Sequence, residues 1–518
     1  MSSPVSDGRD ARTSREQQRV ALAFGFLAVL VGTAAALYYA QAGLTLSHYD
    51  ARAHLVVARR IVDSLTPGWQ QVGAVWLPLP HLLNMLPAQL DVLYRTGASA
   101  VAMSVASTGV AAWAIASLIL RTTPSRSGAG AAVALIVLNP NVLYLQSTPM
   151  TESLLFGTTT ASLALTAAWI ERGARGWPHA AGAMLSAACL TRYEAWPVTA
   201  CAIVLAGVIL LRRGADGRRA LVACVQLASW PALAIVLFLI NSRWTVGAWF
   251  VSGGFFLAEN IAALGNPLVA WEQVRDGLHA LSGAGLVWSA YAGTALVVLT
   301  LVRSPARAPL ALVLALAGAA ALPISAYVQG HPFRIRYDVP LVIASAALAG
   351  AGVSLLWSRI QPLAAAAVIA VALVQAPPLQ SSAPMVTEAQ LELRSYTGRR
   401  AVSDYLVAHR DDGTIMMSMG SLAHYMQDLA SEGFRLRDFL HEGNGDLWND
   451  AIRDPRALAA WIAIEEKAEE GDALHREARR RPEFLAGYTR VAEGGGVALY
   501  RAHGRVLPAA SFQLPAAR

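Results

Sequence analysis

The chain has 518 residues, of which 55% are hydrophobic and only 14% are charged. Its mean hydropathy is +0.43, whereas an ordinary soluble protein carries about 25% charged residues. The composition therefore indicates a membrane protein. The net charge of +7 does not indicate nucleic-acid binding, because the basic residues are scattered through short segments between apolar runs. The three cysteines lie in or beside apolar runs, so they predict neither a disulfide framework nor a cysteine metal site.

Apolar windows predict about 11 membrane-spanning helices, since one crossing of a bilayer needs roughly 20 apolar residues. The windows fall at residues 20–40, 98–120, 129–146, 152–170, 178–190, 196–211, 220–241, 284–302, 308–328, 339–357 and 362–376. The fifth window is short. The predicted fold class is an all-α polytopic membrane bundle, with a transmembrane domain over residues 20–376.

The distribution of arginine predicts the orientation of the bundle. Arginines precede the first window and fill alternate loops at residues 121–126, 172–175, 212–219, 303–307 and 359. Cytoplasmic loops are enriched in such residues, so residues 1–19 are expected to be a cytoplasmic tail. An odd number of spans places everything after residue 376 outside. In the alternative interpretation, Ala40-Gln41-Ala42 is the cleavage site of a signal peptide, but the acidic residues of a long n-region argue against it.

The loop at residues 41–97, between the first two windows, is predicted to be external and to carry juxtamembrane helices. Asp50 and His54 stand four residues apart after the first span and can share one face of a helix. Apolar residues follow at helical spacing until Pro67-Gly68, which indicates an amphipathic helix at the membrane surface. Ionisable groups at such a place are costly and usually functional.

The predicted topology places further polar motifs on the same outer side. They are Thr148-Pro149-Met150-Thr151-Glu152, Thr191-Arg192-Tyr193-Glu194, Arg243-Trp244 and His331-Pro332-Phe333-Arg334-Ile335-Arg336-Tyr337-Asp338. Carboxylates, arginines and aromatic rings from separate loops are therefore expected to meet above an apolar bundle. Such a cluster suits a substrate with a charged head and a lipid tail.

The composition becomes polar over residues 377–518, a length that suits one small domain. The pattern predicts helices at 387–409 and 421–429, strands at 414–419 and 496–502, and helix over 455–480. This alternation indicates a small α/β or α+β domain outside the cytoplasm, which covers the site or positions an acceptor.

In these motifs the chain resembles the GT-C superfamily of integral-membrane glycosyltransferases, which includes protein O-mannosyltransferases and aminoarabinose transferases. The resemblance covers roughly residues 20–376. It rests on Tyr49-Asp50 with His54, Trp76-Leu77-Pro78, Pro149-Met150-Thr151-Glu152, Arg192-Tyr193-Glu194 and Arg336-Tyr337-Asp338-Val339-Pro340. The first loop departs from the paired Asp-Glu pattern of the mannosyltransferases, because Ala51 follows Asp50.

The resemblance implies a hexosyl- or pentosyltransferase of the bacterial cell envelope that uses a polyprenyl-phosphate sugar donor at the outer face of the inner membrane. Asp50 is expected to be the general base that activates an acceptor hydroxyl, with inversion at the sugar. Candidate ligands of the donor phosphate are Arg192, Arg334 and Arg336. Candidate substrate-binding residues are His54, Glu152, Tyr193, Glu194 and Tyr337. The acceptor is a glycan, a lipid or a protein, and membrane lipids are the other partners.

Each of these roles has a structural alternative. Asp50 can cap its helix, His54 can be hydrogen-bonded, the glutamates can pair with arginine, and the arginines can anchor to lipid headgroups. A divalent cation, Mg or Mn, has candidate ligands in Asp50, His54, Glu152 and Glu194, although nothing in the sequence fixes their geometry. A transporter or lipid flippase with an extracytoplasmic domain is the alternative function, but no internal repeat supports it.

Overall fold

The computed structural model describes residues 5–251 and 260–504. The chain forms two compact units. The first comprises Met1–Gln41, Ala74–Leu79 and Val101–Thr387, and the second comprises Ala42–Gly73, Pro80–Ala100 and Glu388–Arg518. Residues 1–4 of the predicted cytoplasmic tail and residues 505–518 of the predicted C-terminal domain lie outside the described residues.

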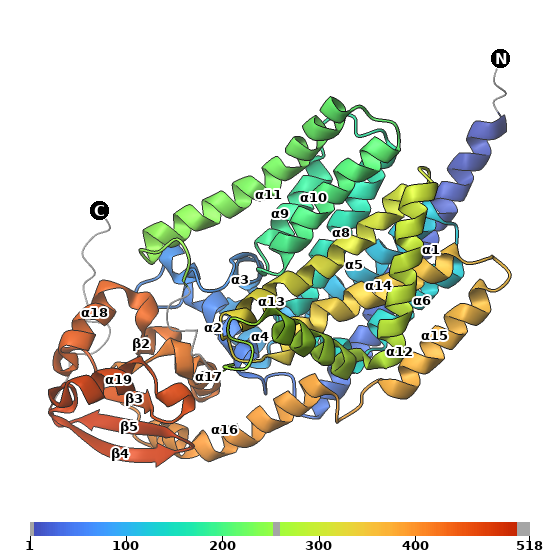
Figure 1. Cartoon of the computed structure of the whole chain (residues 1–518). Helices are drawn as coiled ribbons and strands as arrows, with labels where there is room; N and C mark the ends of the chain where they lie inside the picture. The colour runs from blue at the N-terminus through green and yellow to red at the C-terminus, as the bar shows by residue number, and fades with distance from the viewer. Residues whose placement is uncertain (1–4, 252–259, 505–518) are drawn as a thin grey trace. The chain divides into compact units, whose positions relative to one another are not determined.

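The first unit is a bundle of apolar helices (Figure 1). Its helices are α1 (Val5–Gln41), α5 (Ala98–Thr122), α6 (Arg126–Val137), α7 (Pro140–Leu145), α8 (Glu152–Glu171), α9 (His179–Cys189), α10 (Ala195–Arg212), α11 (Gly217–Thr245), α12 (Pro267–Arg303), α13 (Ala321–Val328), α14 (Val339–Leu355) and α15 (Gln361–Gln375). Two 3-10 segments, η3 (Ala308–Ala320) and η4 (Ile335–Asp338), lead into α13 and α14.

Every predicted window contains helix, and the window at 129–146 is divided between α6 and α7. Within the described residues, 8 of the helices are long and apolar enough to cross a membrane. The other three windows contain the shorter helices α6, α9 and α15. The predicted positions of the spans therefore agree with the observed helices, and the chain is a multi-pass membrane protein.

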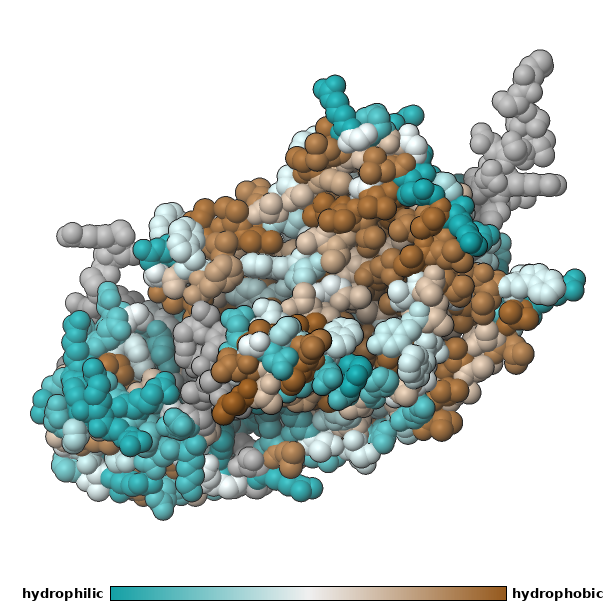
Figure 2. All heavy atoms as spheres, in the orientation of Figure 1, coloured by the Kyte–Doolittle hydropathy of each residue, from teal (hydrophilic) through white to brown (hydrophobic). Residues whose placement is uncertain are grey.

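Apolar side chains cover the outside of this bundle, as expected where lipid rather than water is the solvent. Large residues of α11 are strongly exposed, among them Leu221, Val225, Leu233 and Leu237. Figure 2 shows the matching hydrophobic surface over the bundle. No water is needed there to satisfy the backbone, because the hydrogen bonds of a helix are made within it.

Small residues let α12 and α14 pack closely inside the bundle. Gly293 of α12 lies against the backbone carbonyl of Leu348, and a Cβ atom added to Gly352 of α14 would lie 2.6 Å from Cα of Gly293. Small residues at helix interfaces bring backbones together in membrane proteins, where burial of apolar surface alone gives little attraction between helices.

The second unit contains the polar C-terminal chain. Its sheet has the order β2-β1-β3-β5-β4, in which β1 pairs in parallel with β2 and β3, while β3–β5 and β5–β4 are antiparallel. The strands are β1 (Ile415–Met417), β2 (Phe439–Leu440), β3 (Trp461–Glu465), β4 (Tyr488–Gly494) and β5 (Val497–Ala502). The longer helices are α16 (Pro384–Ala408), which begins in the first unit, α17 (Met419–Leu429), α18 (Asp446–Arg453) and α19 (Ala473–Arg480). This confirms a small module of helices and strands.

The predicted helix over residues 455–480 is wrong in its first half. That segment contains β3, and only α19 is helical at its end. All five residues of β3 are buried, and they pair with β1 on one side and β5 on the other. A central strand that is buried on both faces does not alternate between apolar and polar residues as a half-exposed strand does. Its short apolar run therefore does not distinguish a strand from a helix.

The loop after α1 folds with the C-terminal chain, whereas the predicted division assigns residues 41–97 to the transmembrane domain. This part of the second unit holds α2 (Tyr49–Arg60), the 3-10 turn η1 (Trp69–Val72), the later residues of α3 (Leu79–Asn84), the 3-10 turn η2 (Pro87–Gln89) and α4 (Asp91–Thr96). Its polar groups find partners far along the sequence. The hydroxyl of Tyr49 donates hydrogen bonds to the carbonyls of Met419 and Gly420. Asp63 accepts a hydrogen bond from Arg437 at 2.9 Å, and another from its neighbour Arg59 at 3.1 Å.

Candidate functional site

Glu152 is the centre of an ionic cluster in the first unit. It is the first residue of α8, and its side chain is fully buried. Arg192, from the loop between α9 and α10, places Nη1 3.0 Å from Oε1 of Glu152, and Arg336, from η4, places Nε 3.5 Å from the same oxygen. One carboxylate oxygen thus holds two guanidinium groups.

Glu194 completes the cluster on the other side of Arg192. Its Oε1 accepts hydrogen bonds from Nη2 and Nε of Arg192 at 2.6 and 3.0 Å, and the hydroxyl of Thr151 accepts one from Nη1 at 3.1 Å. Burial alone lowers the pKa of Arg192, but the carboxylates of Glu152 and Glu194 outweigh it and raise that pKa above its ordinary value. The guanidinium of Arg192 therefore stays charged although little of it is exposed.

The predicted residues Glu152, Arg192, Glu194 and Arg336 are brought together in this way. The structure also agrees with the alternative that both glutamates are ion-pair partners of arginine. Two positive and two negative groups make the cluster neutral overall. Such a buried set is costly to assemble, because each charge loses its water, and it persists only where the groups satisfy one another.

Other predicted residues of the first unit lie on the same loops. Tyr193 follows Arg192, donates its hydroxyl to the carbonyl of Val75 at 3.4 Å, and packs edge-on against Trp196. Arg334 is exposed, and the structure anchors it through its backbone, which hydrogen-bonds the hydroxyl of Tyr327. The ring of Tyr337 lies beside that of His331, with centroids 5.5 Å apart.

Asp338 is a buried carboxylate that the predicted site omits. It ends η4, two residues after Arg336, and none of its surface is exposed. Within the described residues, neither carboxylate oxygen has a hydrogen-bond partner. One of these oxygens lies so close to Gly277 of α12 that a Cβ atom there would overlap it. The motif Arg336-Tyr337-Asp338 was the sequence signal, but sequence alone does not reveal that Asp338 is buried.

Asp50 and His54 belong to the second unit, on α2. Asp50 lies in the first turn and is half-buried, but the N-cap residue of α2 is His48, whose Nδ1 accepts a hydrogen bond from the backbone N–H of Asp50 at 3.1 Å. Asp50 therefore does not occupy the N-cap position. His54 is buried and hydrogen-bonds His81, with 3.0 Å between Nδ1 and Nε2. The structure thus supports the alternative of a hydrogen-bonded role for His54, and its partner His81 is not among the predicted site residues.

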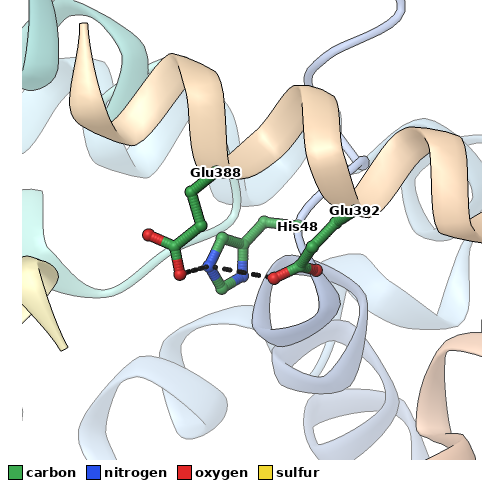
Figure 3. A group of neighbouring side chains, drawn as sticks. All are labelled: His48, Glu388 and Glu392. Atoms are coloured by element: carbon green, nitrogen blue, oxygen red, sulfur yellow. Dashed lines mark hydrogen bonds and ion pairs between the residues drawn. The ribbon is translucent and has the colours of Figure 1, made fainter. Parts of the chain in front are cut away.

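Figure 3 shows a second group around α2, which is not among the predicted site residues. His48 faces Glu388 and Glu392, which lie one turn apart on α16, with its Nε2 3.3 and 3.5 Å from their Oε1 atoms. Within the described residues, these three form a group whose ligand atoms all lie within 4.8 Å of one another. Two glutamates at positions i and i+4 were the only sequence signal, and the pattern is common on solvated helices.

The four predicted metal-ligand candidates are divided between the units. Asp50 and His54 belong to the second unit, whereas Glu152 and Glu194 belong to the first, where both hold Arg192. A carboxylate that already neutralises an arginine is a poor ligand for a cation, because binding must first break the ion pair.

The chain combines an apolar helical bundle with a smaller unit that contains a mixed sheet, and this fold defines it as a multi-pass membrane protein. Among solved structures, the chain is similar to ArnT from Cupriavidus metallidurans bound to undecaprenyl phosphate, with a TM-score of 0.51, 15% identity and coverage of 91% of this chain and 97% of that one. It is also similar to ArnT from the same organism in the apo state, with a TM-score of 0.50, 12% identity and coverage of 90% and 96%. Neither a protein-family model nor a curated protein matches the sequence. The predicted fold class, a polytopic helical bundle with a small C-terminal domain of helices and strands, is confirmed, and its fold is similar to that of the two ArnT structures.

Proposed function

We propose that this protein is a membrane glycosyltransferase that moves a sugar from a polyprenyl-phosphate donor to an acceptor hydroxyl. The observation that carries the proposal is the likeness of fold to ArnT, which extends over 91% of the chain. One of the two ArnT structures is bound to undecaprenyl phosphate, the kind of lipid that such a donor leaves behind. The motifs on which the sequence resembles aminoarabinose transferases include Arg192-Tyr193-Glu194 and Arg336-Tyr337-Asp338, which contribute the arginines of the buried cluster.

In the proposed reaction, the oxygen of the acceptor hydroxyl attacks the anomeric carbon of the donor sugar. A new carbon–oxygen bond forms, the bond from that carbon to the lipid phosphate breaks, and the phosphate leaves with the bonding electrons. Asp50 takes the hydroxyl proton as general base, which suits a half-buried carboxylate. Because this is a single displacement, the configuration of the anomeric carbon is inverted.

The departing phosphate needs positive charge, and Arg192, Arg336 and the exposed Arg334 are proposed to supply it. Glu152 already brings the guanidinium groups of Arg192 and Arg336 to one oxygen, despite their mutual repulsion. Guanidinium groups match phosphate oxygens in bidentate geometry, so a phosphate can replace a carboxylate as their partner. His54, Glu152, Tyr193, Glu194 and Tyr337 are proposed to contribute to binding of the sugar and acceptor.

The protein is proposed to lie in the cytoplasmic membrane, with its N-terminus in the cytoplasm and residues 377–518 outside. The arginine-rich loops support this orientation. A cysteine introduced at exposed Asp446 should then react with a membrane-impermeant thiol reagent in intact cells. If that cysteine is labelled only after the cells are broken, residues 377–518 lie in the cytoplasm and the proposed orientation is wrong.

The experiment that tests the function uses the purified full chain in lipid with a panel of polyprenyl-phosphate hexoses and pentoses. Glycans, lipids and peptides serve as acceptors, and the release of free polyprenyl phosphate is measured. Asp50→Asn should lower the rate of polyprenyl-phosphate release by at least about 100-fold, which is the loss expected when a general base is removed. Asp446→Asn is the matched control, because Asp446 is an exposed carboxylate in the first turn of another helix of the same unit.

Two outcomes would contradict the proposal. Retention of configuration in the product would exclude the single displacement. If the folded protein releases polyprenyl phosphate from no donor of the panel, the transferase is rejected in favour of a transporter or lipid flippase, and a lipid translocation assay in vesicles becomes the next measurement.

A further inference from the structure

The first turn of α2, which carries Asp50, is held by residues of α16. Glu392 accepts a hydrogen bond from the backbone N–H of Tyr49, and the Nε2 atom of His48 lies 3.3 Å from Glu388 and 3.5 Å from Glu392. These contacts lie within the second unit, although more than 300 residues of sequence separate the partners. Figure 3 shows the imidazole between the two carboxylates. We call His48, Glu388 and Glu392 the α16 clamp.

The hydrogen bond at Nδ1 of His48 decides what the α16 clamp can bind. That nitrogen accepts the N–H of Asp50, so it uses its lone pair and carries no proton. In the neutral imidazole the proton then resides on Nε2, which donates it toward the glutamates. A metal ion at Nε2 requires the lone pair that this proton occupies. The three residues therefore do not fit a divalent cation, although their ligand atoms lie within 4.8 Å of one another.

The α16 clamp suits a different partner, the N-terminus of α2. The first N–H groups of a helix have no partner inside it, and the helix dipole favours negative charge at that end. Glu392 accepts a hydrogen bond from the backbone N–H of Tyr49, and Nδ1 of His48 accepts one from the backbone N–H of Asp50. His48 is oriented by the carboxylates on α16, so the backbone of Asp50 is held by a chain of hydrogen bonds that ends on Glu388.

Electrostatics link the same groups. Burial raises the pKa of Glu392, and the negative charges of Asp50 and Glu388 raise it further, while His48 and the N–H of Tyr49 act in the opposite direction. The charges of Glu392 and Asp50 therefore repel each other, and a change in the charge of one shifts the pKa of the other.

We propose that His48, Glu388 and Glu392 are positioning residues that fix the first turn of α2 and thereby orient the carboxylate of Asp50. This inference rests on the proposed function, in which Asp50 is the general base. A small displacement of a catalytic group lowers the rate of the chemical step far more than it changes substrate binding.

The variants are chosen to separate the clamp from simple capping of the helix. His48→Asn keeps a good N-cap residue for α2 but removes the imidazole that reaches α16. Glu392→Ala removes the acceptor of the Tyr49 N–H, and Glu392→Gln restores an oxygen acceptor without the charge. Asp404→Ala is the control, because Asp404 is an exposed carboxylate on the same helix.

The first readout is the transferase reaction of the full chain. His48→Asn and Glu392→Ala should lower kcat by about 10- to 100-fold with little change in KM for the donor, and Glu392→Gln should recover part of that loss. Asp404→Ala should leave both constants unchanged. A rise in KM with unchanged kcat would overturn the inference. A second result would also overturn it. In that result, excess chelator removes wild-type activity, a divalent ion restores it, and His48→Asn weakens the restoration.

The second readout does not depend on activity and therefore separates failure of the clamp from failure of the proposed function. Hydrogen exchange of peptides that cover residues 45–55 reports on the N–H groups of the first turn of α2. His48→Asn and Glu392→Ala should speed exchange there by at least tenfold while α17 keeps its protection. Unchanged exchange at residues 45–55 would reject the clamp, even if the transferase activity is confirmed.

Discussion

Oε1 of Glu152 lies 3.0 Å from Nη1 of Arg192, in an ion pair whose carboxylate has no exposed surface. Removal of Arg192 takes one of the two guanidinium groups from Glu152 and leaves the buried carboxylate of Glu194 without its ion-pair partner. Arg192→Gln should therefore destabilise the protein by about 3–5 kcal/mol. Thermal unfolding in detergent tests this, and the double variant with Glu152→Gln should lose less than the sum of the two single variants.

The control for this prediction is an exposed ion pair of the same kind. Nη1 of Arg121 lies 3.2 Å from Oε2 of Glu171, but 41% of the Arg121 side chain is exposed. Arg121→Gln should cost less than about 1 kcal/mol, because water screens such a pair. If Arg121→Gln and Arg192→Gln lower the free energy of unfolding equally, burial of the Arg192 cluster contributes nothing to stability.

Asp338 should respond in the opposite way to Arg192. Its buried carboxylate has no hydrogen-bond partner among the described residues, so replacement by an apolar side chain of similar size removes an uncompensated polar group. Asp338→Leu should raise the unfolding temperature, whereas Asp338→Asn, which stays polar, should not. A fall in stability for Asp338→Leu would show that the carboxylate is held by a favourable interaction. A gain in stability together with a loss of turnover would assign Asp338 to the active site.

Close packing of α12 against α14 makes a prediction that is independent of charge. A Cβ atom at Gly293 would overlap the carbonyl of Leu348, so Gly293→Ala should force the helices apart and cost about 1–3 kcal/mol. Gly217→Ala is the control, because a Cβ atom at this first residue of α11 meets no other atom within 4 Å. Similar unfolding temperatures for the two variants would contradict the close contact.

Two buried histidines should make the protein sensitive to acid. Burial, with the charge of Arg60 second, lowers the pKa of His441 from 6.5 to about 3, and burial with Arg399 and Arg52 lowers the pKa of His424. Between the lowered values and 6.5 the unfolded chain binds protons that the folded chain does not. Stability is therefore complete above pH 6.5 and falls as the pH drops, by about 1.4 kcal/mol per pH unit for each histidine.

Unfolding temperatures between pH 7.5 and pH 5 measure this dependence. The variant with His424→Gln and His441→Gln should show a flatter decline below pH 6.5 than the wild type. His409→Gln, at the exposed residue that follows α16, should keep the wild-type slope. If the double variant declines as steeply as the wild type, other groups cause the acid sensitivity.

Much of the bundle was predictable because hydropathy is a local property. A run of apolar residues is sufficient to locate a helix of the bundle, and every predicted window contains helix, although the window at 129–146 is divided between α6 and α7. The ionic cluster was partly predictable for the same reason, since Glu152, Arg192 and Arg336 stand in polar motifs at the ends of apolar runs. Their mutual contacts were not predictable, because three separate loops must converge before the distances exist.

The remaining features depend on contacts between distant parts of the chain. Trp461 to Glu465 forms a strand only because β1 and β5 lie on either side of it. Asp63 and Arg437 are 374 residues apart, and neither residue type indicates the other. Glu388 and Glu392 resemble any solvated pair on a helix until His48 lies between them.

The composition of the second unit has a consequence for biosynthesis. The segments Ala42–Gly73 and Pro80–Ala100 leave the ribosome long before their partners in Glu388–Arg518. At about 5–20 residues per second, the roughly 290 residues between Ala100 and Glu388 need on the order of 15–60 s. Throughout that interval α2 exists without β1, β3 or α17. The second unit can therefore be completed only after the chain of the bundle has been synthesised, and a chain that stops before Glu388 lacks the C-terminal partners of its first loop.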